Sequence, residues 1–307
     1  MGKQIRGMGL LTLTAFIWGT AFVAQSVGTG YISPFTFNAV RFFIGGASLL
    51  PVMLIMSILS RGKPDAARAP DADIPHALMK GGLYCGVILF IAAFMQQSGI
   101  SYTTAGKAGF ITALYIIIVP ILGISLGRRV PLYMWVCAAA AVAGMYLLCI
   151  KESLSLNKGD AYILVCAFLY AGHILVIDRF SPLVDGVKMS CVQFFSCGAL
   201  SLICSFIFEH PELSAVWDAR MPLLYTGVLS SGVAYTLQIV AQKDVNPVIA
   251  TLIMSLESVF AALAGWVALS ETLSLREITG CVVMFAAIIA AQTLGVLKSE
   301  PVASAGA

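Results

Sequence analysis

The chain carries little charge for its length. Of its 307 residues, 11% are Asp, Glu, Lys or Arg, whereas 59% are hydrophobic and the mean hydropathy is +0.93. Soluble domains carry roughly 25% charged residues, so this chain cannot cover the surface of a water-soluble enzyme. Disorder is excluded for the opposite reason, because apolar residues dominate. The net charge of +3 forms no basic stripe that would bind nucleic acid. The sequence therefore predicts an integral membrane protein.

Several chemical motifs are missing as well. The eight cysteines form no Cys-x-x-Cys pair and no cluster with metal-ligand spacing, so we interpret them as small buried apolar residues. No segment matches the Gly-x-x-x-x-Gly-Lys-Ser/Thr phosphate loop, so the chain is not expected to hydrolyse ATP. A His/Asp/Glu cluster and a nucleophile–base pair are also missing, which argues against an enzyme. We expect no catalytic residues, no metal and no cofactor.

Long apolar runs fill most of the chain. A membrane-spanning helix needs about 20 predominantly apolar residues. Ten runs have about this length: 8–28, 35–59, 80–99, 105–126, 132–150, 159–178, 189–208, 221–241, 247–269 and 276–297. The linkers between them are too short to form an extramembrane domain with its own core. The predicted fold is an all-α integral membrane protein with ten transmembrane helices.

Lys and Arg residues are distributed unequally between the two sides that ten spans define. Twelve of the eighteen lie on the side that holds both chain ends, five lie on the other side, and Arg41 lies inside a span. Cytoplasmic loops carry the excess of Lys and Arg, so both termini are predicted to be cytoplasmic. The expected location is the cell membrane, with residues 299–307 forming a disordered cytoplasmic tail.

The two halves of the chain share a pattern. Ala15-Phe16-x-Trp18 matches Ala167-Phe168-x-Tyr170, and Leu83-Tyr84-x-Gly86 matches Leu224-Tyr225-x-Gly227. The second alignment also pairs Phe94 with Tyr235 and Gln97 with Gln238. Residues 1–150 and 151–298 are therefore predicted to be two five-helix repeats. Because five is odd, the second repeat is expected to be inverted, an arrangement typical of secondary transporters.

The chain resembles the EamA-type transporters of the drug/metabolite transporter superfamily over essentially its whole length. The segments that carry the resemblance are Phe16–Phe22, Ala39–Phe42, Thr104–Phe110, Leu114–Tyr115, Ser255–Ala262 and Ser270–Leu273. Two positions depart from the family pattern. Ser258 stands where a proline often follows the ninth-span glutamate, and Gly127-Arg128-Arg129 replaces an acidic end of the fourth span. The resemblance implies movement of small metabolites, often amino acids or amphipathic compounds and frequently outward.

Three ionisable side chains inside the predicted spans are candidate site residues. Glu257 is the one acidic side chain deep inside a span, where a charge is costly and indicates function by default. It could bind a substrate ammonium, carry a coupling proton, or be a hydrogen-bonded packing residue. Arg41 could snorkel to the outer surface, pair with a carbonyl or a helix end, or hold a substrate carboxylate. His173 could relay protons, because imidazole changes charge near neutral pH, or remain a neutral hydrogen-bonded residue.

Aromatic and amide side chains recur at helical spacing and predict a cavity between the repeats, suited to amphipathic solutes. The candidate substrate-binding residues are Trp18, Phe94, Gln97, Tyr115, Tyr170, Tyr235, Gln238 and Glu257. The alternative is ordinary packing with amides bonded across helices. Lys107, at the start of the fourth span, is expected to snorkel toward the outer boundary.

The function that these features favour is a secondary transporter of small metabolites, such as amino acids, working by alternating access. A channel or passive receptor is the first alternative, and a membrane-embedded enzyme is the second. The expected partners are a small-molecule substrate and the lipid bilayer. Proton coupling and a homodimer stay open at this point.

Overall fold

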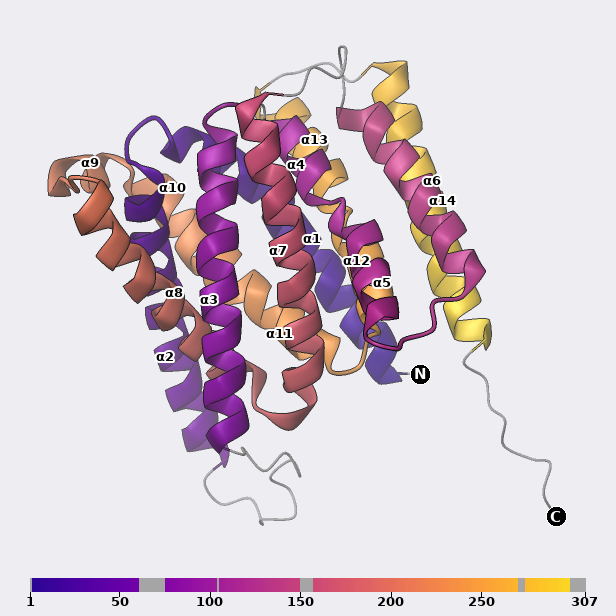
Figure 1. Cartoon of the computed structure of the whole chain (residues 1–307), viewed down its shortest axis with the longest axis horizontal. Coiled ribbons are helices and arrows are strands. Elements are labelled where there is room, and N and C mark those ends of the chain that lie inside the picture. The colour runs from indigo at the N-terminus through magenta and orange to yellow at the C-terminus, as the bar shows by residue number, and fades with distance from the viewer. Residues whose placement is uncertain (1, 61–74, 104, 150–156, 270–273, 299–307) are drawn as a thin grey trace.

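A computed structural model describes residues 2–60, 75–103, 105–149, 157–269 and 274–298 of the chain. All regular elements in these ranges are helices (Figure 1). They are α1 (Gly2–Gly28), α2 (Pro34–Ser60), α3 (Pro75–Ile100), α4 (Ala105–Thr112), α5 (Tyr115–Ser125), α6 (Leu132–Cys149), α7 (Lys158–Phe180), η2 (Ser181–Leu183), α8 (Gly186–Phe208), α9 (Leu213–Asp218), α10 (Arg220–Leu224), η3 (Tyr225–Tyr235), α11 (Thr236–Gln242), α12 (Pro247–Met254), α13 (Glu257–Leu269) and α14 (Leu275–Lys298). The predicted tail, 299–307, lies outside the described residues.

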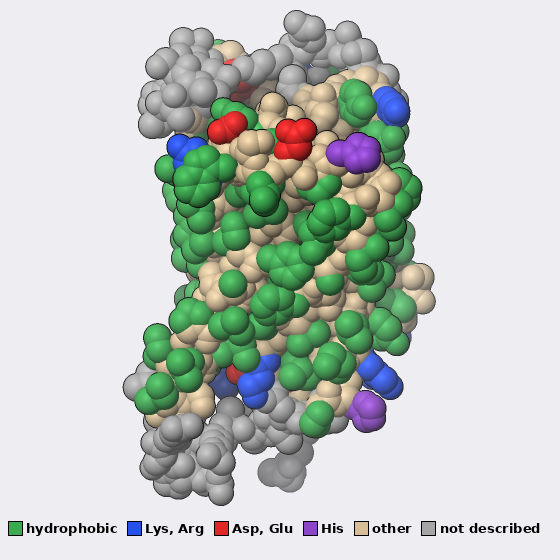
Figure 2. Space-filling view, turned by 90° about the vertical axis from the view of Figure 1, so that its left-hand side faces the viewer, with side chains coloured by type: hydrophobic (Ala, Val, Ile, Leu, Met, Phe, Trp, Pro, Cys, Tyr) green, Lys and Arg blue, Asp and Glu red, His purple; other side chains and the backbone are tan. Residues whose placement is uncertain are grey.

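Among the residues that the structure describes, eight helical segments are long and apolar enough to cross a membrane. A ninth, Leu132–Leu148 in α6, is apolar but shorter, and α14 occupies the place of the tenth predicted span. Figure 2 shows one face of the molecule on which hydrophobic side chains cover the middle, while charged and histidine side chains lie toward the two ends. An apolar belt between two polar ends is the surface that a bilayer requires. The chain is therefore a multi-pass membrane protein, as the sequence predicts.

Two spans predicted as continuous helices each contain a tight turn. The helix of the fourth span is interrupted at Ala113–Leu114, between α4 and α5. The helix of the ninth span is interrupted at Ser255–Leu256, between α12 and α13. At both places the backbone hydrogen bonds change from the i→i−4 pattern of an α-helix to an i→i−3 pattern. Leu114 N–H donates to the Ile111 carbonyl at 3.2 Å, and Leu256 N–H donates to the Ile253 carbonyl at 3.1 Å. Short stretches of this kind inside a helix often mark a functional hinge.

The eighth span is also irregular, because the residues of η3 form a π-helix. Its carbonyls accept bonds from side chains of α1: Thr14 Oγ1 donates to the Ala234 oxygen at 3.2 Å, and Trp18 Nε1 donates to the Ser230 oxygen at 3.2 Å. A widened helix turn displaces carbonyls from their usual acceptor positions, and π-helical segments frequently occur at functional sites. These bonds fix α1 against η3.

The two halves of the chain pack against each other along most of their length. Helix α2 contacts α8, α3 contacts α7, α1 contacts η3 and α11, and α6 contacts α14. In the last pair, Gly144 and Gly280 let the backbones meet, because a Cβ on Gly144 would lie 2.8 Å from the Gly280 oxygen. Small residues allow such close approach of helices in membranes. The largest core cluster joins residues of both halves and surrounds the cavity described next.

Candidate functional site

A cavity lies at the centre of the bundle, where helices of both halves meet. Its walls come from α1, α2, α3, α4, α5, α7, η3, α11, α12 and α13. The lining residues are Trp18, Phe22, Gln25, Arg41, Gln96, Thr112, Tyr115, Tyr170, His173, Ile174, Ser230, Tyr235, Gln238, Met254 and Glu257. Rings and polar groups alternate around the wall, the composition of a site that binds small molecules.

Tyr115 and Glu257 meet across the two tight turns. Each is the first residue of the half-helix that follows its turn, Tyr115 in α5 and Glu257 in α13. The Tyr115 hydroxyl donates to Glu257 Oε1 at 3.0 Å, and both side chains are buried. A carboxylate in the first turn of a helix also faces the positive end of the helix dipole. The hydrogen bond and the dipole together explain how an acidic group is kept in the bundle core.

Arg41 contributes the opposite charge to the same cavity. It is 2% exposed, and its Nη1 donates to Gln25 Oε1 at 2.9 Å. The guanidinium lies over the rings of Phe42 and Phe37, with its Cζ 4.6 Å and 5.7 Å from the ring centroids. Its Nε has no hydrogen-bond partner among the described residues. Arg41 is thus held inside the bundle, and the snorkelling interpretation is wrong.

Neither buried charge is neutralised by the other residues that the structure describes. Within that part of the chain, Arg41 and Glu257 form no ion pair. An unpaired charge in the core of a membrane protein is expensive and marks a ligand or ion pathway. The cavity wall therefore holds one guanidinium and one carboxyl group, neither of them in an ion pair within the described residues.

Hydrogen bonds between side chains order the remaining wall. Tyr235 donates its hydroxyl hydrogen to the Tyr170 oxygen at 3.1 Å, and Tyr170 donates to Gln96 Oε1 at 3.3 Å. His173 Nε2 and Gln193 Oε1 are 3.0 Å apart, and the imidazole packs edge-on against the Tyr235 ring. Gln238 lines the cavity with an Oε1 that has no partner among the described residues. That amide oxygen is available to a solute.

Most of the predicted site residues come together in this cavity. Trp18, Arg41, Tyr115, Tyr170, His173, Tyr235, Gln238 and Glu257 all line it. Phe94 and Gln97 lie outside its lining. Phe94 stacks on Phe35 with ring centroids 4.0 Å apart, and Gln97 Nε2 donates to the Gln25 backbone oxygen at 3.1 Å.

The sequence interpretation missed several lining residues: Phe22, Gln25, Gln96, Thr112, Ile174, Ser230 and Met254. Gln25 and Gln96 carried a usable signal, since they are amides inside apolar spans. No set of three or more His, Cys, Asp or Glu side chains in the described ranges is placed to hold a metal ion.

Comparison with known protein families shows to which family this chain belongs. The sequence model of the EamA-like transporter family matches residues 5–150 and again residues 157–292, which together make up most of the chain. The chain belongs to the EamA-like transporter family. Membership confirms the resemblance seen in the sequence and indicates transport rather than catalysis.

Curated relatives of this EamA-like transporter carry transporter names without a stated substrate. An uncharacterized transporter of Archaeoglobus fulgidus is 29% identical over 280 residues, covering 91% of this chain and 83% of the relative. The uncharacterized transporter YoaV of Bacillus subtilis is 24% identical, covering 90% of this chain and 93% of the relative. A solved crystal structure aligns with a TM-score of 0.74 at 19% identity, covering 95% of this chain and 98% of that chain. That likeness supports the fold alone.

Proposed function

We propose that this EamA-like transporter is a secondary carrier that moves small zwitterionic metabolites, amino acids above all, by alternating access. The observation that carries the proposal is the pair of opposite, unpaired charges, Arg41 and Glu257, in one buried cavity. An α-amino acid presents a carboxylate and an ammonium that fit these two groups. The rings of Trp18, Tyr170 and Tyr235 form an apolar wall for its side chain.

The relation between the two halves of the chain supports alternating access. In the two halves, α1 corresponds to α7, and α3 corresponds to η3 with α11. If the halves are exchanged, the α3–α7 contact becomes the contact of η3 and α11 with α1, and the α2–α8 and α6–α14 contacts are each replaced by themselves. The two tight turns correspond as well, since Ile116 N–H donates to the Ala113 oxygen where Ser258 N–H donates to the Ser255 oxygen. These correspondences support ten crossings in two inverted five-helix repeats, 1–150 and 151–298. In such a carrier, the halves exchange conformations around a fixed central site.

Proton coupling at Glu257 is a second candidate property, favoured by the lack of a described cationic partner. A carboxyl in the bundle core can be neutralised by a substrate ammonium or by a proton. The proposed direction is export across the cell membrane, as the family resemblance implies.

Purified protein provides the first test of the substrate class. A ligand present at 100 times its dissociation constant stabilises the folded state by about 2.7 kcal/mol. We expect at least one of the twenty common amino acids to raise the thermal midpoint of the wild type and to leave the midpoint of an R41M/E257Q double variant unchanged. A screen without any stabilising amino acid contradicts the zwitterion proposal.

The proposed orientation places both termini in the cytoplasm. In Figure 1, α1 begins and α14 ends at the same end of the bundle, which is also the end where α2 ends and α3 begins. Exposed His76 is the second residue of α3, and exposed Ser33 directly precedes α2, whose start lies at the opposite end of that helix. In intact cells, an impermeant thiol reagent should label a cysteine at Ser33 and should spare one at His76. The reverse pattern contradicts the orientation.

Gln238 and Gln97 are expected to differ, although they correspond in the two repeats. Gln238→Leu removes an amide from the cavity wall and should reduce transport of the bound solute, because a site built to hydrogen-bond its ligand loses affinity without that group. Gln97→Leu removes a bond to the α1 backbone and should mainly lower the thermal midpoint. Transport rates normalised to the amount of folded protein distinguish them. Equal loss of transport in both variants contradicts the assignment of Gln238 to the solute.

A further inference from the structure

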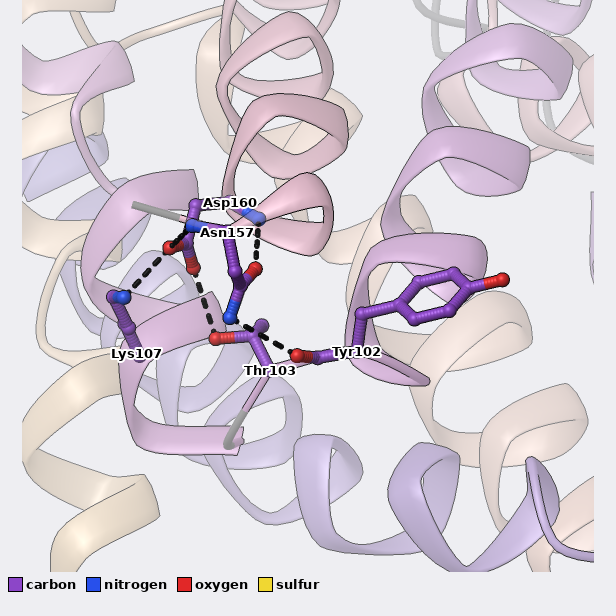
Figure 3. Close-up of polar contacts among 5 residues, drawn as sticks. All are labelled: Tyr102, Thr103, Lys107, Asn157 and Asp160. Atoms are coloured by element: carbon purple, nitrogen blue, oxygen red, sulfur yellow. Dashed lines mark hydrogen bonds and ion pairs between the residues drawn. The ribbon is translucent and has the colours of Figure 1, made fainter. Parts of the chain in front are cut away.

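A partly buried ion pair joins the first turn of α4 to the first turn of α7, at one end of the bundle and outside the cavity lining. Figure 3 shows the pair and its hydrogen-bonded neighbours. Lys107 Nζ, at the start of α4, is 2.6 Å from Asp160 Oδ2, at the start of α7. The Lys107 side chain is 15% exposed and that of Asp160 is 1% exposed. The expected snorkelling of Lys107 to the boundary is thus wrong, because its ammonium turns toward this carboxylate.

Further hydrogen bonds converge on the same carboxylate. Thr103 Oγ1 donates to Asp160 Oδ1 at 2.9 Å, and the Asn157 backbone N–H donates to Oδ2 at 2.8 Å. Asn157 Nδ2 in turn donates to the Tyr102 carbonyl at 3.1 Å. The group ties the end of α3 and the start of α4, both in the first repeat, to the start of α7 in the second (Figure 3).

Helix α4 connects this ion pair to the cavity. It runs from Ala105 to Thr112, and Thr112 lines the cavity and accepts a hydrogen bond from Gln96 at 3.5 Å. The tight turn at Ala113–Leu114 follows directly and leads to Tyr115, the partner of Glu257. A half-helix with a hinge at one end and an ion pair near the other can rotate about the hinge as a rigid element next to the cavity.

The corresponding contact in the other half has the same geometry without the charges. Aligning Trp18 with Tyr170 pairs Gly7 with Gly159. Aligning Tyr115 with Glu257, a register one residue later than the one that pairs Gln97 with Gln238, pairs Gly99 with Ala241. A Cβ on Gly159 would lie 2.9 Å or less from the Gly99 oxygen and Tyr102 Cβ, and a Cβ on Gly7 would meet the Ala241 oxygen and Val245. The helix contacts are therefore equivalent.

The side chains at the two equivalent contacts differ in kind. The positions that correspond to Asp160 and Lys107 are Met8 and Ile249, and Val245 corresponds to Thr103. Ile249 and Val245 are buried in the main core cluster, and Met8 packs against it. One of the two equivalent contacts thus carries an ion pair with supporting hydrogen bonds, and the other carries apolar side chains at the corresponding positions.

We propose that Lys107 and Asp160 form a gate latch, which holds the cavity closed toward their end of the bundle and breaks each time the cavity opens there. The proposal rests on the alternating access proposed above. Because an inverted repeat makes the two end contacts exchange roles, a latch at only one end favours the state that is closed there. The equivalent apolar contact has no charges of its own to separate, whereas opening at Lys107 separates a partly buried ion pair.

Accessibility of the cavity from each side tests the latch without a known substrate. A reporter cysteine replaces Ser230, a cavity residue that is 4% exposed, in a chain whose eight native cysteines are changed to alanine or serine. An impermeant methanethiosulfonate reagent is added to one membrane face at a time. Asp160→Asn keeps the size of the side chain and removes its charge. We expect labelling from the Lys107 face to rise roughly tenfold, which corresponds to about 1.4 kcal/mol of lost preference for the closed state.

Two more variants separate a latch from a general loss of stability. Lys107→Met keeps the length of the stem, leaves the bonds between Asn157 and Asp160 in place, and should give the same sided increase. The double variant should match either single variant, because residues that act as a pair are not additive. Asp178→Asn is the matched control, since Asp178 also lies on α7 and pairs with Arg128. It should not increase labelling from the Lys107 face.

The outcomes distinguish the explanations. A sided increase in both single variants supports the latch, even if no transported solute is found. Unchanged labelling in both single variants overturns it, and so does an equal increase from both faces, which indicates loosened packing.

Discussion

Replacing Arg41 with methionine is expected to weaken binding of a carboxylate-bearing solute by roughly 10- to 150-fold. A hydrogen bond to a charged group contributes about 1.5–3 kcal/mol, and each 1.4 kcal/mol corresponds to a factor of ten in affinity. Methionine keeps apolar contact with the rings of Phe37 and Phe42, so the fold should tolerate it. Calorimetric titration with the most stabilising amino acid of the screen measures the loss.

A matched control is available at the corresponding position of the second repeat. Gln193 aligns with Arg41 and is fully buried, but it is not part of the cavity lining. Gln193→Met should leave the affinity within about threefold of wild type, because surrounding packing rather than the solute is altered. The amide derivative of the same amino acid, which lacks the carboxylate charge, should bind wild type and R41M equally. If R41M binds the intact amino acid as tightly as the wild type does, Arg41 is structural.

Replacing Glu257 with glutamine should produce the complementary loss. Glutamine keeps an oxygen that can accept the Tyr115 hydroxyl bond and removes the negative charge. If Glu257 holds the ammonium, affinity for the amino acid should fall by roughly 10- to 150-fold, for the same physical reason as at Arg41. Binding of the deaminated acid, which has no ammonium, should be unaffected by the substitution.

Proton coupling predicts a different result for the same variant. If Glu257 carries a proton on the return of the empty carrier, E257Q should keep its affinity and lose its response to a pH gradient. Exchange of solute for solute should survive, since exchange does not require the empty carrier to return. Affinity and exchange measured in proteoliposomes, with and without a gradient, separate the two roles. Unchanged affinity together with an unchanged pH response contradicts both.

The sequence located the helices well because the length of an apolar run is a direct consequence of membrane thickness. The run predicted at 35–59 corresponds to α2, Pro34–Ser60, and the run at 189–208 corresponds to α8, Gly186–Phe208. The tight turns were not predictable in the same way. Neither Ala113–Leu114 nor Ser255–Leu256 contains the proline or glycine that signals a helix break.

The cavity residues show a finer limit of sequence reasoning. Gln97 was selected because it aligns with Gln238, but the adjacent Gln96 lines the cavity instead. Consecutive side chains on a helix point roughly 100° apart, so the rotation of a helix within the bundle decides which of two neighbouring amides reaches the solute. Apolar periodicity could not fix that rotation, because α3 is apolar on most of its surface.

Long-range pairing also escaped the sequence interpretation. Lys107 and Asp160 lie in different repeats, and each is placed near the end of its predicted span, where a charged residue normally faces water. Arg41 was identified as a candidate from its position inside a span, but only the three-dimensional structure shows that Gln25 of α1 accepts its hydrogen bond and holds it within the cavity. Contacts between helices depend on tertiary packing, which no single-helix pattern encodes.

Counterflow in proteoliposomes tests the central claim, alternating access to a central site, most directly. Vesicles are loaded with a high concentration of the unlabelled amino acid selected by the screen, and uptake of a trace of the same radiolabelled amino acid is followed. The proposed mechanism predicts uptake that saturates with external solute and is several-fold faster in loaded than in empty vesicles, with both effects lost in R41M. Uptake that rises linearly with concentration and is indifferent to the internal solute would contradict the mechanism and indicate a channel.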